Sequence, residues 1–157
     1  MLGANEIADY FINLSSPGTK RNITNLKLQK LLYYAQGMYL SQPREQGFDV
    51  LFEDTIRAWK HGPVVPGIYR RFSKYVFNEI DKKEINHGSI RAIEENKLDV
   101  FLDKVWTKYG AYNGKQLERM SHMEEPWKNT RGNLPSYVSS NAEIPIHLIK
   151  EYFSKKE

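Results

Sequence analysis

The sequence predicts a mainly α (α+β) fold: one compact helical domain of about five to six helices with a small β element. Apolar residues recur at helical spacing in six segments, and one segment alternates with the period of a strand. The 157-residue chain is 40% hydrophobic and 27% charged, as globular proteins are. No repeat or low-complexity linker divides it, so we expect a single domain over residues 1–157.

The first helix is expected over residues 5–14. Within this range Ile7, Ala8 and Phe11 fall on one helical face, which predicts that this face is buried. Residues 15–18 (SSPG) end the helix, because proline cannot continue a helix and glycine tolerates the turn.

The second helix is expected to begin at Asn25, a suitable N-cap. Its apolar residues recur at i, i+3, i+4, i+7 and i+11, and they are Leu28, Leu31, Leu32, Ala35 and Tyr39. Lys27, Lys30 and Tyr34 share a different, more polar face, which we expect to be exposed to solvent. A loop follows over residues 43–47.

Residues 55–59 (TIRAW) alternate with the period of two that is typical of a short, half-buried strand. A single strand needs a partner, which we expect in residues 48–51 or 79–85. The next segment, residues 61–66 (HGPVVP), is the most constrained of the chain, because two of its residues each precede a proline. It predicts a stiff turn before the third helix.

The remaining helices are predicted from the spacing of apolar residues and from the prolines and glycines at their ends. Pro66 suits the first position of the third helix, because the N–H that proline lacks has no partner there. We expect this and the later helices at residues 66–76, 93–109, 114–123 and 145–153. Between them we expect irregular structure at residues 78–89, a turn at 125–127 and a polar loop at 129–141.

Composition excludes several classes of site. The chain has no cysteine, which excludes disulfides, thiolate zinc sites and cysteine nucleophiles. Its four histidines are scattered without the spacing of a metal site, and we expect neither metal nor cofactor. The N-terminus lacks the basic region of a secretory signal, and the apolar runs are far shorter than the ~20 residues of a membrane span. We therefore expect a cytoplasmic protein without membrane contact.

No motif identifies a reaction. The sequence contains no Gly-rich phosphate loop, HExxH helix or G-x-S-x-G elbow. Ser121 and His122 stand beside Glu124 and Glu125, but sequence neighbours on a helix do not face one another. We therefore expect no enzyme, and a small hydrolase built on His61 or His122 is kept only as an alternative.

The formal net charge of +4 comes from charges that are segregated along the chain. Residues 55–77 contain five Lys and Arg and no acidic residue, and residues 20–30 form a second basic stretch. Residues 78–103 are acidic by contrast. Aromatic residues interleaved with the basic ones are compatible with a nucleic-acid surface. We favour instead a solvated protein face that the acidic segment balances.

Trp59 is the sharpest indication of a binding function. It is out of phase with Ile56 and Ala58, so it should face away from the core side of its strand. A tryptophan beside a stiff, proline-flanked turn is typical of binding hot spots. The candidate partner-binding residues are this tryptophan, its two neighbours and the polar face of the preceding helix: Lys27, Lys30, Tyr34, Trp59, Lys60 and His61.

Three long motifs stand in order along the chain. They are residues 23–37 (ITNLKLQKLLYYAQG), 58–69 (AWKHGPVVPGIY) and 122–127 (HMEEPW). Through these motifs the chain resembles the Panacea-domain family, also described as SocA-like antitoxins and phage-associated proteins. The resemblance covers residues 7–153.

The resemblance implies an antitoxin of a toxin–antitoxin system, typically encoded beside its toxin on a prophage or similar mobile element. Members of the family neutralise cognate toxins by direct binding, and one branch resembles a proteolytic adaptor that delivers its toxin to a AAA+ protease. The domain pairs with unrelated toxin folds and supplies no catalytic residues. The expected partner is a toxin protein encoded by the adjacent gene. The alternative is a nucleic-acid-binding regulator of its own operon or prophage.

Overall fold

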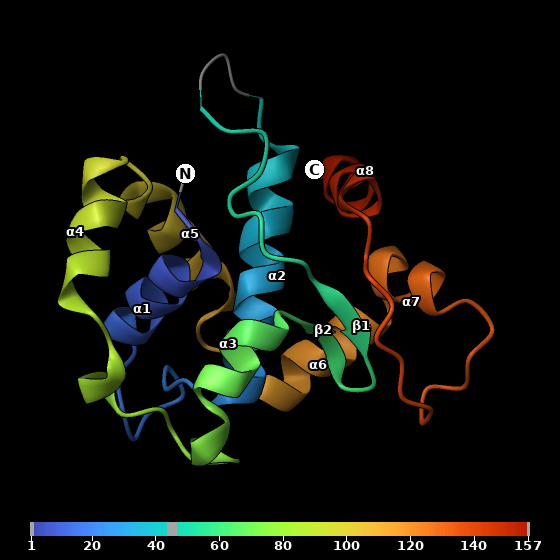
Figure 1. Cartoon of the computed structure of the whole chain (residues 1–157), viewed down its shortest axis with the longest axis horizontal. Coiled ribbons are helices and arrows are strands. Elements are labelled where there is room, and N and C mark those ends of the chain that lie inside the picture. Colours follow the sequence, from blue (N-terminus) through green and yellow to red (C-terminus); the bar gives the residue numbers. More distant parts are fainter. Residues whose placement is uncertain (1, 44–46, 157) are drawn as a thin grey trace.

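Helix α2 (Asn25–Ser41) passes through the middle of the molecule, with other elements on both sides (Figure 1). The structure is a computed structural model that describes residues 2–43 and 47–156. The helix begins where Thr24 Oγ1 accepts a hydrogen bond from the N–H of Lys27 at 3.3 Å, so the N-cap lies one residue before the expected one. Fourteen of its 17 residues are buried, which leaves almost no solvent-facing side.

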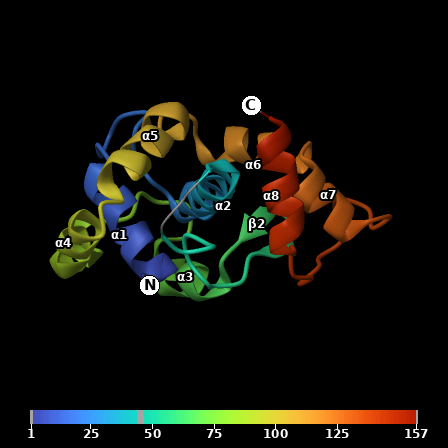
Figure 2. The same cartoon turned by 90° about the horizontal axis from the view of Figure 1, so that it is seen from above.

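Helix α1 and three helices packed around it lie on one side of α2, as the view from above shows for most of them (Figure 2). Their bounds are α1 (Ala4–Leu14), α3 (Pro66–Arg71), α4 (His87–Glu95) and α5 (Asp99–Tyr109). Apolar packing is supplemented by one buried charge, since Asp9 accepts hydrogen bonds from both Arg71 and Ser89. These bonds join α1 to α3 and α4, and they leave the buried carboxylate paired.

Three helices and a small β-hairpin lie on the other side of α2 (Figure 1). The helices are α6 (Gly114–His122), α7 (Glu125–Arg131) and α8 (Ile146–Lys155). The last of these packs closely on α2 at Gly37, where a Cβ atom would lie 2.3 Å from the ring of Phe153. Glycine is therefore required at this crossing by space, since only a hydrogen fits between the two helices.

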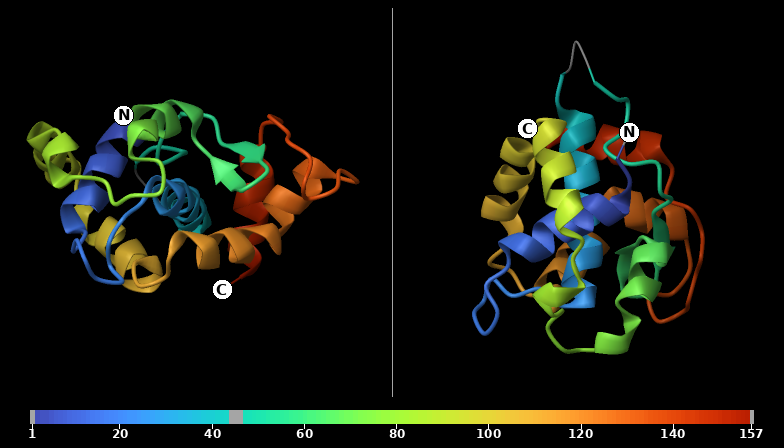
Figure 3. Two further views of the ribbon diagram at one scale, coloured as in Figure 1. Left: turned by 90° about the horizontal axis from the view of Figure 1, so that it is seen from below. Right: turned by 60° about the vertical axis from the view of Figure 1, so that its left-hand side comes forward.

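The hairpin consists of β1 (Arg57–Trp59) and β2 (Gly62–Val64), paired antiparallel with Trp59 opposite Gly62. Seen from below, it lies between α3 and the group of α6 to α8 (Figure 3). The connection is short, and Gly62 closes it with a φ of 103°, a conformation that favours glycine. Residues 142–144 extend the sheet beyond β1, because the N–H of Ala58 donates to the carbonyl of Ala142 at 2.8 Å.

The outer side of β2 is closed by side chains of α2. Gln29 accepts a hydrogen bond from the N–H of Val65 at 2.9 Å, and Lys30 donates to the carbonyl of Pro63 at 3.0 Å. Unpaired strand edges are sites of unwanted pairing between chains. Here the edge is covered, and the hairpin is fixed to the central helix by polar contacts.

The expectation of a mainly helical fold with a small β element is confirmed, although the described residues contain eight α-helices rather than five or six. The expected helix over residues 93–109 is two helices, because Lys97 adopts a φ of 59° and ends α4. The expected turn at 125–127 is the start of α7, where Pro126 suits the first turn. The expected helix over 66–76 ends at Arg71 and continues as the 3-10 turn Ser73–Tyr75.

The expected strand partner is wrong. Neither residues 48–51 nor 79–85 pair with β1, whose partner is the proline-containing segment Gly62–Val64. Proline argues against a strand because it lacks the N–H of the ladder. Ala58, opposite Pro63, donates its own N–H to Ala142 on the other side, so this pair exchanges no hydrogen bond and tolerates the proline.

The loop expected over residues 43–47 falls mainly on residues 44–46, which lie outside the described residues. The segment that follows is fixed to α2, because the amide of Gln36 bonds the backbone of both Leu51 and Phe52. Across residues 2–43 and 47–156, no helix is both long and apolar enough to cross a membrane.

Gly37→Ala should destabilise the protein by about 1–3 kcal/mol, the usual cost of overpacking a core. The new methyl group would overlap the buried ring of Phe153 and push α8 from α2. The matched control is Gly67→Ala in α3, where nothing lies within 4 Å and alanine should be neutral or stabilising. Urea denaturation measures both, and equal stabilities of the two variants would contradict the packing argument.

Candidate binding groove

Lys27, Lys30 and Tyr34 are 1%, 0% and 0% exposed, so the expectation of a solvent-facing stripe on the second helix is wrong. The physical reason is the central place of α2, whose polar face is covered by other elements. The Lys27 ammonium donates to the carbonyl of Gly110 at 2.6 Å and lies 5.3 Å from the ring of Trp106. This lysine fastens the segment between α5 and α6 to α2 instead of facing a partner.

Lys30 lies beneath the hairpin. Its Nζ donates to the carbonyl of Pro63 at 3.0 Å, and burial lowers the pKa of its ammonium to about 7. A Cβ on Gly62 would lie 2.8 Å from Lys30 Cε and 2.9 Å from Ser121 Oγ. The glycine, the lysine and the serine therefore fit tightly together, and Lys30 positions the hairpin.

Tyr34 belongs to a buried polar cluster between α2 and the start of α7. Tyr33 and Tyr34 donate to the two carboxylate oxygens of Glu124 at 3.0 and 3.1 Å, and Lys156 Nζ lies 3.7 Å from the same group. Burial raises the pKa of the Glu124 carboxyl. Two of the three sequence motifs thus meet inside the protein, where Tyr33 and Tyr34 of the first satisfy the Glu124 carboxylate of the other.

Trp59, Lys60 and His61, by contrast, stand at the surface on the hairpin and its turn. As the period of two predicts, Ala58 is buried while the half-buried Trp59 lies on the other face. Its ring packs edge to face on Tyr69 with centroids 5.2 Å apart, and its Nε1 donates to Asn141 Oδ1 at 2.9 Å. The indole is therefore held in one orientation.

These three residues line a groove of about 1060 Å³. Its walls come from the start of α2, the hairpin, α3, residues 76–77 and residues 139–141. No Asp or Glu is among the described residues that line it, whereas five Lys and Arg are: Lys30, Arg57, Lys60, Arg70 and Lys115. The groove is therefore basic, and Trp59 and Tyr69 supply aromatic surface within it.

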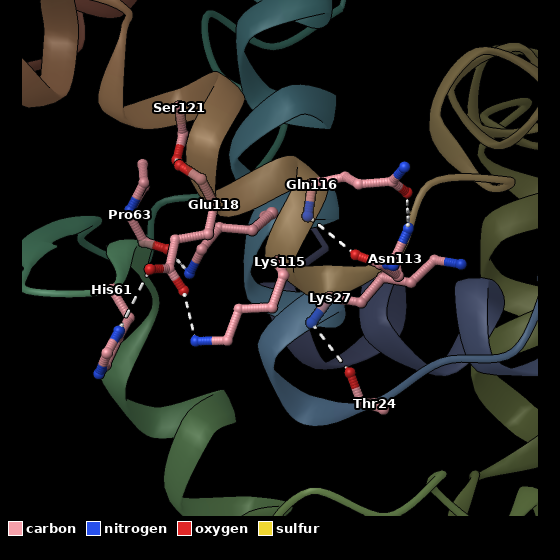
Figure 4. A network of polar contacts seen from close by, with 10 residues as sticks. Thr24, Lys27, His61, Pro63, Asn113, Lys115, Gln116, Glu118 and Ser121 are labelled. Atoms are coloured by element: carbon pink, nitrogen blue, oxygen red, sulfur yellow. Dashed lines mark hydrogen bonds and ion pairs between the residues drawn. The ribbon is translucent and has the colours of Figure 1, made fainter.

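Glu118 stands behind the groove and holds two of its side chains in place (Figure 4). Its Oε2 lies 3.3 Å from His61 Nδ1, and its Oε1 lies 3.4 Å from Lys115 Nζ. Although burial opposes ionisation, the hydrogen bond from His61 and the charge of Lys115 lower the pKa of the Glu118 carboxyl. The carboxylate thus orients His61 and partly balances the positive charge.

The basic stretch of residues 55–77 divides between two places in the fold. Three of its members face the groove, whereas Arg71 pairs with the buried Asp9 and Lys74 pairs with Glu84 at 2.6 Å. The expected balance between this stretch and the acidic residues 78–103 is therefore realised only in part, through Glu84. No acidic residue of the segment 78–103 is among the described residues that line the groove, so this segment does not balance the Lys and Arg residues there.

Sequence reasoning missed most of the other wall of the groove. Val76 and Phe77 line it together with residues 139–141 and with Tyr69, one of the aromatic residues of the possible nucleic-acid surface. The helical pattern placed residues 66–76 in one continuous helix, and the polar loop at 129–141 carried no signal of its own. A single signal was available, an apolar Val76–Phe77 pair between a basic and an acidic segment.

His122 lies outside the described lining of the groove. Its ring stacks on that of Trp127 at 4.0 Å, and burial lowers its pKa. Of the two histidines of the enzyme alternative, His61 lies in the groove lining and His122 does not. Among the described residues, no group of three or more His, Cys, Asp or Glu side chains is arranged to hold a metal ion.

Comparison with known proteins gives two matches. The family model described as "Antitoxin SocA-like, Panacea domain" matches residues 28–128. The protein "Antitoxin SocA" of Caulobacter vibrioides (strain NA1000 / CB15N) is 37% identical over 142 residues, which cover 83% of this chain and 72% of that protein. No solved structure matches the chain at a significant level.

Lys30→Met should flatten the rise of stability with pH. The pKa of Lys30 is about 7 in the folded protein against 10.5 for an ordinary lysine, so between these values unfolding takes up a proton. The free energy of unfolding therefore rises above pH ~7, and Lys30 supplies ~1.4 kcal/mol per pH unit up to about pH 9.5. Below pH ~7 its contribution is flat.

Urea denaturation between pH 6 and 9.5, a range of about one unit below to 2.5 above the folded pKa, measures this slope. The variant keeps the smaller contribution of Lys27, whose pKa burial lowers to about 8. The matched control is Lys104→Met on the exposed side of α5, which should keep the wild-type slope. An unchanged slope in Lys30→Met would show that the ammonium stays charged beneath the hairpin.

Proposed function

The chain belongs to the family of SocA-like antitoxins with a Panacea domain, and from this premise we propose that it is an antitoxin that neutralises a cognate toxin by direct binding. The observation that carries the proposal is the 37% identity to Antitoxin SocA over 83% of the chain. The function is binding, without a cofactor and without a catalytic residue. It takes place in the cytoplasm, where the toxin of a toxin–antitoxin system acts.

The structure supports the groove as the binding surface. Of the six candidate residues, Trp59, Lys60 and His61 are accessible beside it. The backbone beneath them is rigid, because the carbonyl of Trp59 accepts from Trp127 Nε1 at 2.8 Å and that of Ala58 accepts from Arg131 at 3.1 Å. Pre-organised aromatic side chains carry much of the energy of protein interfaces, since little side-chain entropy is lost on binding.

The proposed partner is a toxin protein encoded by the adjacent gene, on a prophage or similar mobile element. Co-expression with the product of that gene tests the proposal. The product should arrest growth when expressed alone, and this chain should restore growth and co-purify with it. A product that is harmless alone, or that stays toxic in the presence of this chain, contradicts the antitoxin function for that pair.

Two routes to neutralisation are distinguished by the fate of the toxin. If the chain acts as a proteolytic adaptor, the toxin becomes short-lived only when this chain and a AAA+ protease are both present. If binding alone suffices, the complex accumulates and the toxin keeps its half-life. A pulse-chase of the toxin in strains with and without each AAA+ protease separates the routes.

A second candidate function is regulation of the chain's own operon or prophage through nucleic-acid binding. One observation favours it, the groove with five Lys and Arg and no acidic residue among its described lining. A mobility-shift assay with the upstream DNA at about 150 mM salt tests it, because non-specific phosphate contacts weaken steeply with salt. Absence of a shift at this salt excludes operator binding by the chain alone.

Trp59→Ala should weaken toxin binding by about 30-fold or more, as removal of a hot-spot tryptophan costs ~2 kcal/mol or more. The backbone contacts of the hairpin do not use the indole, so the fold should persist. The matched control is Tyr137→Ala, which removes an aromatic side chain that is 74% exposed outside the groove lining. Calorimetry and growth rescue measure both, and full rescue by a folded Trp59→Ala removes this residue from the interface.

A further inference from the structure

Val76 and Phe77 form an exposed apolar pair at the rim of the groove. The Phe77 side chain is 89% exposed and that of Val76 is 61% exposed, and both belong to the groove lining. A phenylalanine normally buries most of its surface in a core. Here its ring stands in solvent at a groove that four surface cations also line, which is an arrangement suited to a partner that offers both apolar and acidic groups.

The turn that presents this pair is strained. Residues 75–78 form a β-turn closed by the N–H of Asn78, which donates to the carbonyl of Tyr75 at 2.9 Å. Val76 has φ 55° and ψ −105°, close to the values of about +60° and −120° at the first central position of a type II′ turn. Glycine dominates this position, and a β-branched residue is an outlier there.

Contacts on both sides hold the turn in this conformation. Before it, Tyr75 donates to Glu84 Oε1 at 2.8 Å. After it, the N–H of Ile80 donates to the carbonyl of Ile23 at 2.9 Å, and the carboxylate of Glu79 accepts from Asn22 at 2.8 Å. Strain persists where the surroundings determine the backbone, and it concentrates at functional sites. The flanking anchors therefore keep Phe77 projecting at the rim.

Four surface cations line the same groove as the pair: Arg57, Lys60, Arg70 and Lys115. Arg57 contacts the carbonyl of Asn141 at 3.1 Å, and Lys115 is shared with Glu118. Within the described residues, Lys60 and Arg70 take part in no ion pair. These two cations are available to carboxylates of a partner without loss of an existing bridge.

We propose that the groove binds an acidic segment of the partner protein, with an apolar side chain of that segment against Phe77 and its carboxylates on Lys60 and Arg70. This inference rests on the proposed function and names the chemistry that its binding site selects. A volume of about 1060 Å³ suits a stretch of chain, since it stands at the upper limit of small-molecule pockets, which are roughly 300–1,000 Å³.

A polypeptide fits the groove better than a nucleic acid. Trp59 and Tyr69 pack edge to face at 72°, so they do not offer parallel open faces on which bases could stack. The aliphatic Val76 beside Phe77 offers nothing to phosphates. A peptide segment that carries both carboxylates and an apolar side chain complements both the cations and the apolar pair of the rim.

The test uses four variants and the purified product of the adjacent gene, with binding measured by calorimetry at about 150 mM salt. Arg70→Glu and Phe77→Ser should each weaken binding at least ten-fold, while Lys104→Glu on α5, a charge reversal outside the groove lining, should change it less than two-fold. Binding by the wild-type chain should weaken as salt is raised, because exposed ion pairs are screened.

Val76→Gly separates binding from folding. The glycine relieves the turn and should raise the Tm by about 2–4 °C, while loss of the valine side chain at the rim should weaken binding several-fold. A variant that is more stable than the wild-type chain cannot lose affinity by unfolding. A lowered Tm would show that the turn is not strained in solution, and unchanged affinity would exclude the pair from the interface.

The outcomes distinguish failure of the acidic-segment proposal from failure of the antitoxin function on which it rests. If the wild-type chain neutralises the toxin and the Arg70 and Phe77 variants bind it equally well, the acidic-segment proposal is wrong and the antitoxin function stands. If the wild-type chain does not bind the product at all, both fail together. If a 20-base-pair DNA binds at about 150 mM salt and Arg70→Glu abolishes that binding, the groove is a nucleic-acid site and the proposal is overturned.

Discussion

The structure depends on burying the polar side chains of α2 with their hydrogen bonds satisfied. A helix that crosses the middle of a protein is usually apolar on every side. This one instead carries Lys27, Gln29, Lys30 and Gln36, all at most 1% exposed. Each contacts backbone outside the helix, at Gly110, Val65, Pro63 and residues 51–52 respectively. Since an unpaired buried polar group costs free energy, these segments are held where the helix needs them.

The groove follows from this constraint. Gln29 and Lys30 fix the outer edge of β2, and the tight fit at Gly62 leaves the hairpin no room to move toward α2. The motif of residues 58–69 is thereby divided, with residues 62–65 buried against α2 and Trp59, Lys60 and His61 outside. Lys30, a sequence candidate for partner contact, instead bonds the hairpin at Pro63. It thereby keeps Trp59, Lys60 and His61 in a defined position.

Sequence reasoning reached the fold class, most helix positions and the outward face of Trp59 on its strand, because local spacing and turn chemistry determine them. It misplaced Lys27, Lys30 and Tyr34, since helical spacing shows which residues share a face but not what covers that face. It missed β2 because Pro63 argues against a strand unless the neighbouring residue pairs elsewhere. It missed Phe77 because exposure at a turn results from tertiary anchors such as Glu79 and Glu84, which leave no periodic signal.

Because two of the family motifs meet inside the protein, the family resemblance says little about the surface that a partner would contact. Residues 23–37 and 122–127 meet inside the protein through Tyr33, Tyr34 and Glu124, so they specify the frame. Several residues of the groove rim, among them Arg70, Phe77 and residues 139–141, lie outside all three motifs. A change at such positions alters charge and shape at the surface without breaking a buried hydrogen bond. The frame can therefore stay constant while the rim changes, and the proposed function assigns the choice of partner to the rim.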